Sequence, residues 1–352
     1  MTQRTITLSQ LTGVLFLSLF PLGTEWLVEL LSPVGSAAWL CPLLAGAVVL
    51  LAAVPLSRRG LGDPLDAFGP RGTRLWAGLF LIWGLILTAA QAARVGSRLA
   101  ESLRASPLLL TAAVLLLAGW MAAGGLPAFA RACKIFALAV GSGFFLILLF
   151  GLFRLEWDGI LLWEPWELAR VPGGAFATAG VLAVGCFALF LRKEVEPEPG
   201  RRRWAVFRLA GLFLLLAVAL VLILGRFGPA LAGRIDRPFF QMVSGLGFEG
   251  AFQRLEELVS ALWVLGDMAL LGFLLLCMEK LAHRMTGKAG DHTVWWLALP
   301  ALLLSLPAVF WSRVLEGPAL LWGTLAAGVL TTLFSALTGR EEKTLKKSEK
   351  RG

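Results

Sequence analysis

Four ionisable residues lie in a stretch of the chain that is long enough to cross a membrane. Arg254, Glu256 and Glu257 open the segment 252–278, and Asp267 lies inside it. About 20 apolar residues suffice to span a bilayer as a helix, and an ionised side chain that faces lipid costs free energy. We therefore expect this helix to turn its charged side chains toward a polar interior.

Helical spacing divides these residues between two faces. Steps of four, three and four place one set on a common side: Glu256, Ser260, Trp263 and Asp267. Arg254 and Glu257 pair at i, i+3 on another side. At about 1.5 Å per residue, Asp267 lies about 20 Å along the axis from Arg254. We interpret Arg254, Glu256 and Glu257 as an outer cluster that braces a gate or a partner contact, and Asp267 as the deeper acid suited to coupling.

The first apolar segment carries a second group of polar residues. It contains Pro21, Gly23 and Thr24, with Glu25 and Glu29 just beyond. Proline removes a backbone donor and glycine weakens a helix, so this sequence favours an interruption that frees backbone groups for a ligand. The alternative is a proline kink in a continuous helix whose glutamates reach outward.

Glycines in the sixth apolar segment give a weaker signal of the same kind. The segment begins at Gly173 and Gly174 and carries Gly180 and Gly185. A break here would interrupt the first helix of each half of the chain, which is the pattern of transporters with inverted repeats and a midplane site. The alternative is that these glycines allow close helix packing.

The third apolar segment places Gln91, Arg94 and Arg98 on one face, in steps of three and four. An arginine within a membrane helix needs a carboxylate or a water-filled cavity. Four acids are available as partners: Glu25, Glu29, Glu256 and Asp267. We assign Gln91 to ligand binding and Arg94 and Glu25 to gating, and the sequence leaves the partner of Arg94 open.

The composition is that of a polytopic membrane protein. The chain has 352 residues, 58% hydrophobic and 16% charged, with a mean hydropathy of +0.78. Its net charge of +9 comes from basic residues in short connectors, so we expect no nucleic-acid partner. The four cysteines and two histidines show no metal-ligand spacing, and no nucleophile arrangement is present. We expect neither a metal, a cofactor nor an enzymatic activity.

Ten apolar segments predict ten helical spans in one transmembrane domain, residues 1–338. They cover approximately 9–31, 35–57, 74–99, 106–123, 128–153, 173–192, 204–226, 253–278, 293–312 and 317–338. The connectors on the side of the N-terminus hold most of the lysines and arginines, which places both termini in the cytoplasm. Residues 339–352 form a charged cytoplasmic tail that we expect to be disordered and that could touch anionic lipid.

Short motifs in this chain resemble the B subunits of nutrient germinant receptors of spore-forming bacteria, also called spore permeases. These belong to the amino acid, polyamine and organocation transporter superfamily. The motifs are Ser36-Ala37-Ala38-Trp39-Leu40, Gly125 to Arg131 with Lys134-Ile135, Arg237-Pro238-Phe239, and Phe252-Gln253-Arg254-Leu255-Glu256 with Trp263. Gln253 departs from the family pattern, which has an acidic residue there.

The resemblance implies an all-α fold like that of the leucine transporter, with two inverted five-helix repeats at about 9–153 and 173–338. The pocket would lie between broken first and sixth helices, where five residues would shape it: Pro21, Gly23, Thr24, Gly180 and Gly185. Members are thought to recognise small germinants such as amino acids, together with an A subunit and a lipoprotein C subunit in the spore inner membrane.

Two other functions remain open on the residues alone. The chain could act by itself as a proton- or cation-coupled amino-acid permease of the cell membrane, with Asp267 or Glu256 as the coupling acid. It could also be a non-transporting scaffold in which the membrane charges only join helices.

Overall fold

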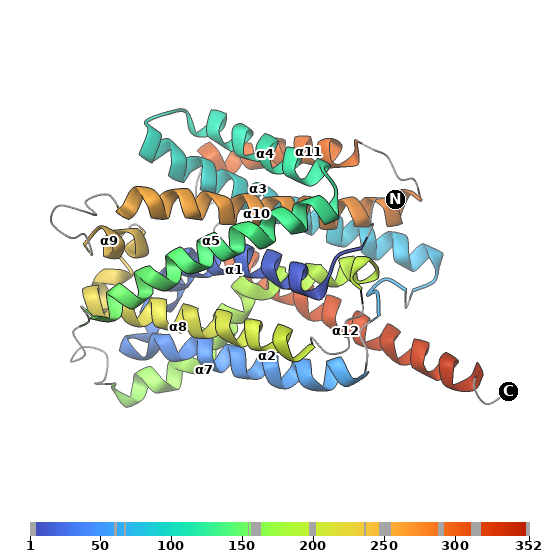
Figure 1. Ribbon diagram of the computed structural model, residues 1–352, viewed down its shortest axis with the longest axis horizontal. Helices are drawn as coiled ribbons and strands as arrows, with labels where there is room; N and C mark the ends of the chain where they lie inside the picture. Colours follow the sequence, from blue (N-terminus) through green and yellow to red (C-terminus); the bar gives the residue numbers. More distant parts are fainter. Residues whose placement is uncertain are drawn as a thin grey trace.

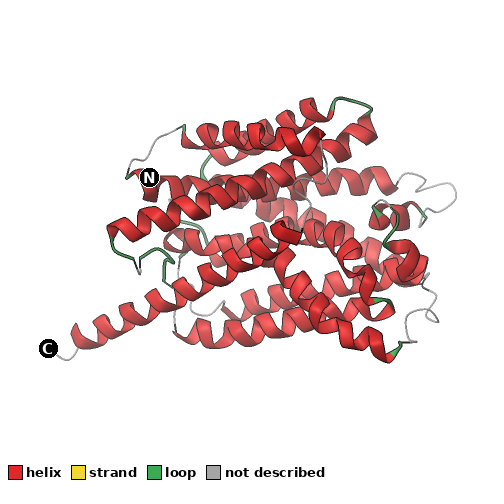
Figure 2. Cartoon of the chain, turned by 180° about the vertical axis from the view of Figure 1, so that it is seen from behind, coloured by secondary structure: helices red, strands yellow, loops and turns green. Residues whose placement is uncertain are grey.

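The computed structural model describes residues 5–59, 62–66, 68–153, 155, 163–196, 202–235, 237–245, 255–287, 292–310 and 318–349. Within these ranges the chain is helical, with a single isolated β-bridge between Ile6 and Val195 (Figure 2). The described α-helices are α1 (Leu8–Leu31), α2 (Leu40–Arg59), α3 (Pro70–Leu103), α4 (Pro107–Ala123), α5 (Leu126–Phe153), α7 (Pro165–Leu182), α8 (Arg202–Ala232), α9 (Pro238–Ser244), α10 (Leu255–Thr286), α11 (Thr293–Phe310) and α12 (Pro318–Glu349). Three 3₁₀ segments join them: η1 (Ser32–Val34), η2 (Ser36–Trp39) and η3 (Ala183–Glu194).

The long helices lie side by side in one bundle (Figure 1). Seven helical segments of the described chain are long and apolar enough to cross a membrane, and three shorter apolar helices cover 36–52, 107–123 and 293–307. The prediction of an all-α, multi-pass membrane protein is therefore confirmed. All ten predicted segments are helical over most of their length, although the second begins with η2.

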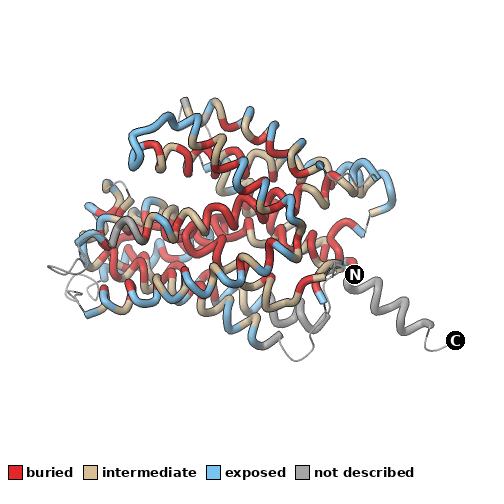
Figure 3. The backbone as a smooth tube through the Cα atoms, turned by 45° about the horizontal axis from the view of Figure 1, so that its top comes forward, coloured by how far each residue is buried: buried red, intermediate tan, exposed pale blue. Residues whose placement is uncertain are grey.

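The buried centre of the bundle is α10. In its most apolar 18-residue stretch, 78% of the residues are buried, which is the largest share among the seven membrane-spanning segments. The apolar residues of α10 are distributed over all sides of the helix, and a helix that is apolar all round is typically buried inside a protein. It packs against α1, α3, α4, α5 and α11. Buried residues accordingly gather along the middle of the bundle, with exposed ones at its margins (Figure 3).

The predicted interruption of the first span is absent. Helix α1 is continuous from Leu8 to Leu31, with Pro21 inside it. Proline 21 cannot donate to the carbonyl of Leu17, but the Thr24 hydroxyl donates to the carbonyls of Phe20 and Pro21, at 3.1 and 2.9 Å. One missing hydrogen bond in a packed helix is thus tolerated, as the alternative of a continuous helix required, but Glu25 pairs inward with Arg98 instead of reaching outward.

The sixth span does change its conformation. Helix α7 ends at Leu182, and η3 continues the chain as a 12-residue 3₁₀ helix to Glu194. A 3₁₀ stretch of this length is unusual, because its hydrogen bonds have poorer geometry than those of an α-helix. The change begins between Gly180 and Gly185, close to where the glycines predicted an interruption.

The C-terminal segment differs from the expected disordered tail. Helix α12 begins at Pro318 and is helical up to Glu349. The charged residues after 338 include good helix formers, Glu and Lys, which extend a helix that the apolar part has already nucleated.

Candidate ion-pair site between three helices

Asp267 lies in the middle of α10 and is almost completely buried. Its side chain is 2% exposed. Gln91 of α3 donates from Nε2 to Oδ1 of Asp267 at 3.1 Å. Arg98 of the same helix donates from Nη2 to Oδ2 in a direct ion pair. Both carboxylate oxygens therefore have a donor on α3, as a buried charge requires.

Arg98 connects this aspartate to a second acid. Its Nη1 donates to Oε2 of Glu25 on α1 at 3.1 Å. The side chains of Arg98 and Glu25 are 7% and 12% exposed, so water screens the pairs little. One guanidinium thus joins α1, α3 and α10, and removing it would leave two carboxylates facing each other in the membrane interior.

The cluster is closer to one end of the bundle than to the other. Glu25 lies six residues before the end of α1, and Arg98 five residues before the end of α3. At about 1.5 Å per residue, each is within about 10 Å of its helix end. With the N-terminus in the cytoplasm, as the basic connectors predict, this end would be the outer one.

Arg94 makes a different contact one turn earlier on α3. Its guanidinium carbon lies 3.5 Å from the centroid of the Trp26 ring, a cation–π arrangement. The indole Nε1 of Trp26 is buried and has no hydrogen-bond partner among the described residues. Consecutive residues of α1, Glu25 and Trp26, therefore contact Arg98 and Arg94 of α3.

A proline and a glycine bring α10 against α1 beside this cluster. A Cβ on Gly266 would lie 2.5 Å from Cγ of Pro21 and 2.9 Å from the carbonyl oxygen of Leu17. Any larger residue than glycine would collide there. Gly266 precedes Asp267, so the close approach sets how near the aspartate comes to α1.

The glycines predicted to shape a pocket instead pack against neighbouring helices. A Cβ on Gly23 would lie 2.7 Å from Leu216 of α8, and one on Gly180 would lie 2.7 Å from Leu321 of α12. One on Gly185 would lie 3.0 Å from Leu19 of α1. These contacts fit the packing alternative.

The predicted outer cluster of Arg254, Glu256 and Glu257 lies mostly outside the part of the chain that the structure describes. Arg254 lies outside the described residues, and Glu256 and Glu257 belong to α10 but their side chains are outside the described part. Their pairing therefore stays a prediction. Ser260 and Trp263 follow on α10, and the Trp263 ring is fully buried.

The rings around Trp263 close the same end of the bundle. Phe144, Phe239 and Phe240 have ring centroids 5.1, 4.8 and 4.4 Å from that of Trp263. Nearby on the surface, Arg237 forms an ion pair with Glu101 of α3. The short helix α9 is thereby fixed to α5, α10 and α3.

The structure adds Arg98 to the predicted site residues. The predicted third span, 74–99, includes Arg98 and places it on one face with Gln91 and Arg94, but no role was predicted for it. Helix α3 continues to Leu103, so Arg98 lies well inside it. The face shared with Gln91 was the signal that could have identified it.

A second ionic network lies at the opposite end of the bundle. Asp63, in the connector between α2 and α3, forms ion pairs with Arg284 of α10 and with Lys193 of η3, the latter at 3.6 Å. Asp66 contacts the same two cations at 3.1 and 2.7 Å. Burial raises the pKa of Asp63, against the opposing effects of the Leu65 N–H and of Arg284. The sequence analysis had treated these basic residues only as topology signals.

The described residues suggest no metal site, since no group of three His, Cys, Asp or Glu among them could hold an ion. No protein-family model matches the chain, and no curated protein matches it in sequence.

Proposed function

We propose that this chain is a transporter-like membrane subunit that binds a small amino-acid-like ligand and responds by a rearrangement of α1 against α3 and α10. The observation that carries the proposal is the Arg98 guanidinium, which pairs with Glu25 and Asp267 across these three helices. Charged residues in membrane helices commonly mark substrate or ion pathways.

The chemistry of the cluster suits a zwitterion. The guanidinium of Arg98 can bind a carboxylate with two parallel hydrogen bonds, and Glu25 and Asp267 can accept hydrogen bonds from an ammonium group. A ligand that replaces the internal ion pairs would offset the cost of separating α1 from α10. It would favour the separated state only to the extent that it binds that state more tightly.

The pattern of ten spans in two inverted repeats is part of the proposal. The helical segments follow the ten apolar stretches, and the sixth span departs from α-helix near its midpoint. On this proposal the first span opens at Pro21 only in another state, since α1 is continuous in the described one.

The sequence motifs favour a germinant receptor of spores, acting with A and C subunits in the spore inner membrane. The test is binding of labelled amino acids to the purified chain, together with germination of spores that carry a Glu25→Gln substitution. Saturable binding that is weaker in the variant, with slower germination, supports the proposal. A folded chain that binds no amino acid, in spores that germinate normally with the variant, contradicts it.

A stand-alone permease is the second candidate, and one observation favours it. Asp267 is a buried acid whose two oxygens bond only Gln91 and Arg98 among the described residues, so a change in its protonation would alter contacts between helices. Such a site can take up a proton or a cation, which a coupled transporter requires. Uptake of labelled amino acids into vesicles that contain only this chain would support the permease, and binding without flux would support the receptor.

A further inference from the structure

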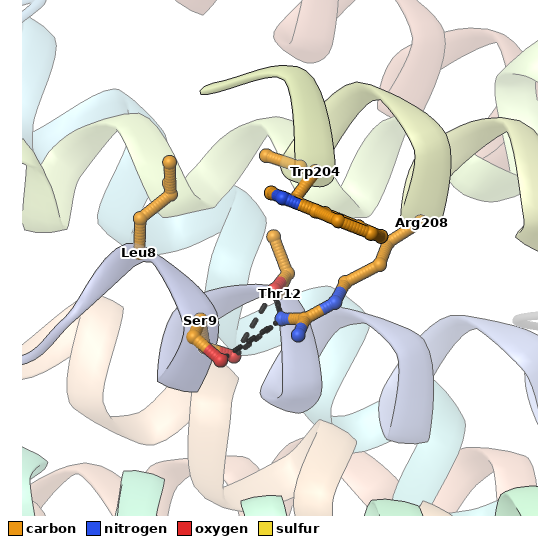
Figure 4. A pocket seen from close by; sticks show the side chains of 6 residues that line it. Leu8, Ser9, Thr12, Trp204 and Arg208 are labelled. Carbon is orange, nitrogen blue, oxygen red and sulfur yellow. Dashed lines mark hydrogen bonds between the residues drawn. The ribbon is translucent and has the colours of Figure 1, made fainter. Parts of the chain in front are cut away.

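A pocket opens where α1 and α8 begin, far from the cluster of Arg98. Its volume is about 200 Å³. The residues that line it come from the first two turns of both helices: Leu8, Ser9, Thr12, Trp204, Ala205 and Arg208 (Figure 4). None of them is acidic, so the pocket presents one positive charge and several hydrogen-bonding groups.

Arg208 is held in place at this pocket by one of its nitrogens. Nη1 donates to the Ser9 carbonyl at 3.2 Å, to the Ser9 hydroxyl at 3.0 Å and to the Thr12 hydroxyl at 2.7 Å. The Thr12 hydroxyl in turn donates to the Ser9 carbonyl at 3.0 Å. Among the described residues, Arg208 uses only Nη1 in hydrogen bonds, so Nη2 and Nε are left to donate to a ligand.

A further donor faces the same space. The Ser9 hydroxyl accepts from Arg208, and its own hydrogen has no acceptor in the described part of the chain. The indole ring of Trp204 lines the pocket together with Arg208 (Figure 4). The guanidinium and hydroxyl groups together form a set that suits an oxyanion.

The surroundings match the headgroup level of a membrane. Trp204 and Phe207 are 66% and 68% exposed, and aromatic rings at helix ends are typical of the membrane interface. Lys134 of α5 lies against α1, since a Cβ on Gly13 would be 3.5 Å from its Cα. The sequence Arg201-Arg202-Arg203 comes just before Trp204, which adds positive charge to this end of α8.

We propose that this pocket binds the phosphate group of an anionic phospholipid headgroup. Arg208 supplies two hydrogen-bond donors and the charge, Ser9 supplies a further hydrogen bond, and the Trp204 ring forms one side of the pocket. The lipid chains lie along the apolar side chains of Leu8 and Phe207. A bound lipid would connect α1 to α8 at the end where α1 begins, so lipid composition would affect the position of α1.

The test measures thermal unfolding of the purified chain in a neutral detergent, titrated with phosphatidylglycerol, phosphatidylcholine or inorganic phosphate. Arg208→Gln removes the two donors and the charge. Arg71→Gln, at an exposed position at the start of α3, removes the same charge outside the pocket and is the matched control. We expect phosphatidylglycerol, but not phosphatidylcholine, to stabilise the wild type and Arg71→Gln at similar concentrations. Arg208→Gln should need about ten-fold more phosphatidylglycerol for half-maximal stabilisation, because the variant loses hydrogen bonds to a charged group.

The same half-maximal concentration in Arg208→Gln and Arg71→Gln would overturn the proposal. Stabilisation by inorganic phosphate that equals that by phosphatidylglycerol and depends on Arg208 would overturn the lipid assignment and identify a site for free phosphate. If Arg208→Gln does not fold, Ser9→Ala serves instead. It should need about three-fold more lipid, since it loses one hydrogen bond of ordinary strength, and an unchanged requirement would refute the site.

Discussion

Replacing Arg98 by glutamine should be among the most destabilising single changes to a polar residue of this chain. The substitution removes two ion pairs and leaves the carboxylates of Glu25 and Asp267 without their common partner. All three side chains are at most 12% exposed, so solvent compensates little. Breaking a buried pair by removing one partner typically costs about 3–5 kcal/mol.

Neutralising Glu25 or Asp267 alone should destabilise the chain less than replacing Arg98. Glu25→Gln keeps the Arg98–Asp267 pair, and we expect a loss of about 1.5–3 kcal/mol, the range for a hydrogen bond to a charged group. Arg237→Gln is the control, because its partner Glu101 is 69% exposed and such surface pairs contribute about 0–1 kcal/mol.

The assay is the free energy of unfolding of purified variants in one detergent, with circular dichroism as the signal. The triple variant Arg98→Gln, Glu25→Gln, Asp267→Asn removes all three charges and should regain most of the stability that Arg98→Gln alone loses. Equal losses in Arg98→Gln and Arg237→Gln, or no recovery in the triple variant, would refute the reasoning.

Three further predictions concern other parts of the bundle. Gly266→Ala should lower the free energy of unfolding by about 1–3 kcal/mol, because the added methyl group overpacks against Pro21. Gly211→Ala, with open space around it, should be neutral or slightly stabilising in the same unfolding assay. Equal effects of the two substitutions would exclude a close contact at Gly266. Asp267→Asn should flatten the pH dependence of ligand binding or uptake, and an unchanged profile would remove this acid from coupling. Burial raises the pKa of Asp63 above its value in the unfolded chain. The contribution of protonated Asp63 to folding stability is therefore fully present below the unfolded pKa of about 4 and is lost as pH rises through the folded pKa. Asp63→Asn should lack this loss in unfolding temperatures measured across the acidic range, and a wild-type profile in the variant would contradict the prediction.

The helical architecture could be predicted because apolar length is a local property. Each of the ten apolar segments contains enough consecutive residues to form a long helix, and charge in the connectors separates them. The end of α3 could not be placed, because its last turns are polar and no proline or glycine stops the helix before Arg104. The predicted span therefore included Arg98 but ended at 99, four residues before the helix does.

The partners in the cluster could be predicted as a group but not individually. A buried arginine requires an acid, and the sequence offered Glu25 and Asp267 among four. Which arginine meets which acid depends on the rotation and depth of three helices, and these are set by packing contacts such as that of Gly266 with Pro21. The same limit applies to Pro21 itself, since one lost hydrogen bond can either open a helix or be tolerated, and here α1 stays continuous through Pro21.

The most direct test of the central claim is a titration of the wild type and of Arg98→Lys with the amino acid that most stabilises the purified wild type. Lysine keeps the positive charge but cannot bind a carboxylate with a two-pronged fork. We expect at least one amino acid to stabilise the wild type and Arg237→Lys equally, and Arg98→Lys to need about ten-fold more of it for the same stabilisation. The same ligand dependence in Arg98→Lys and in the wild type would contradict the assignment of this cluster as the ligand site.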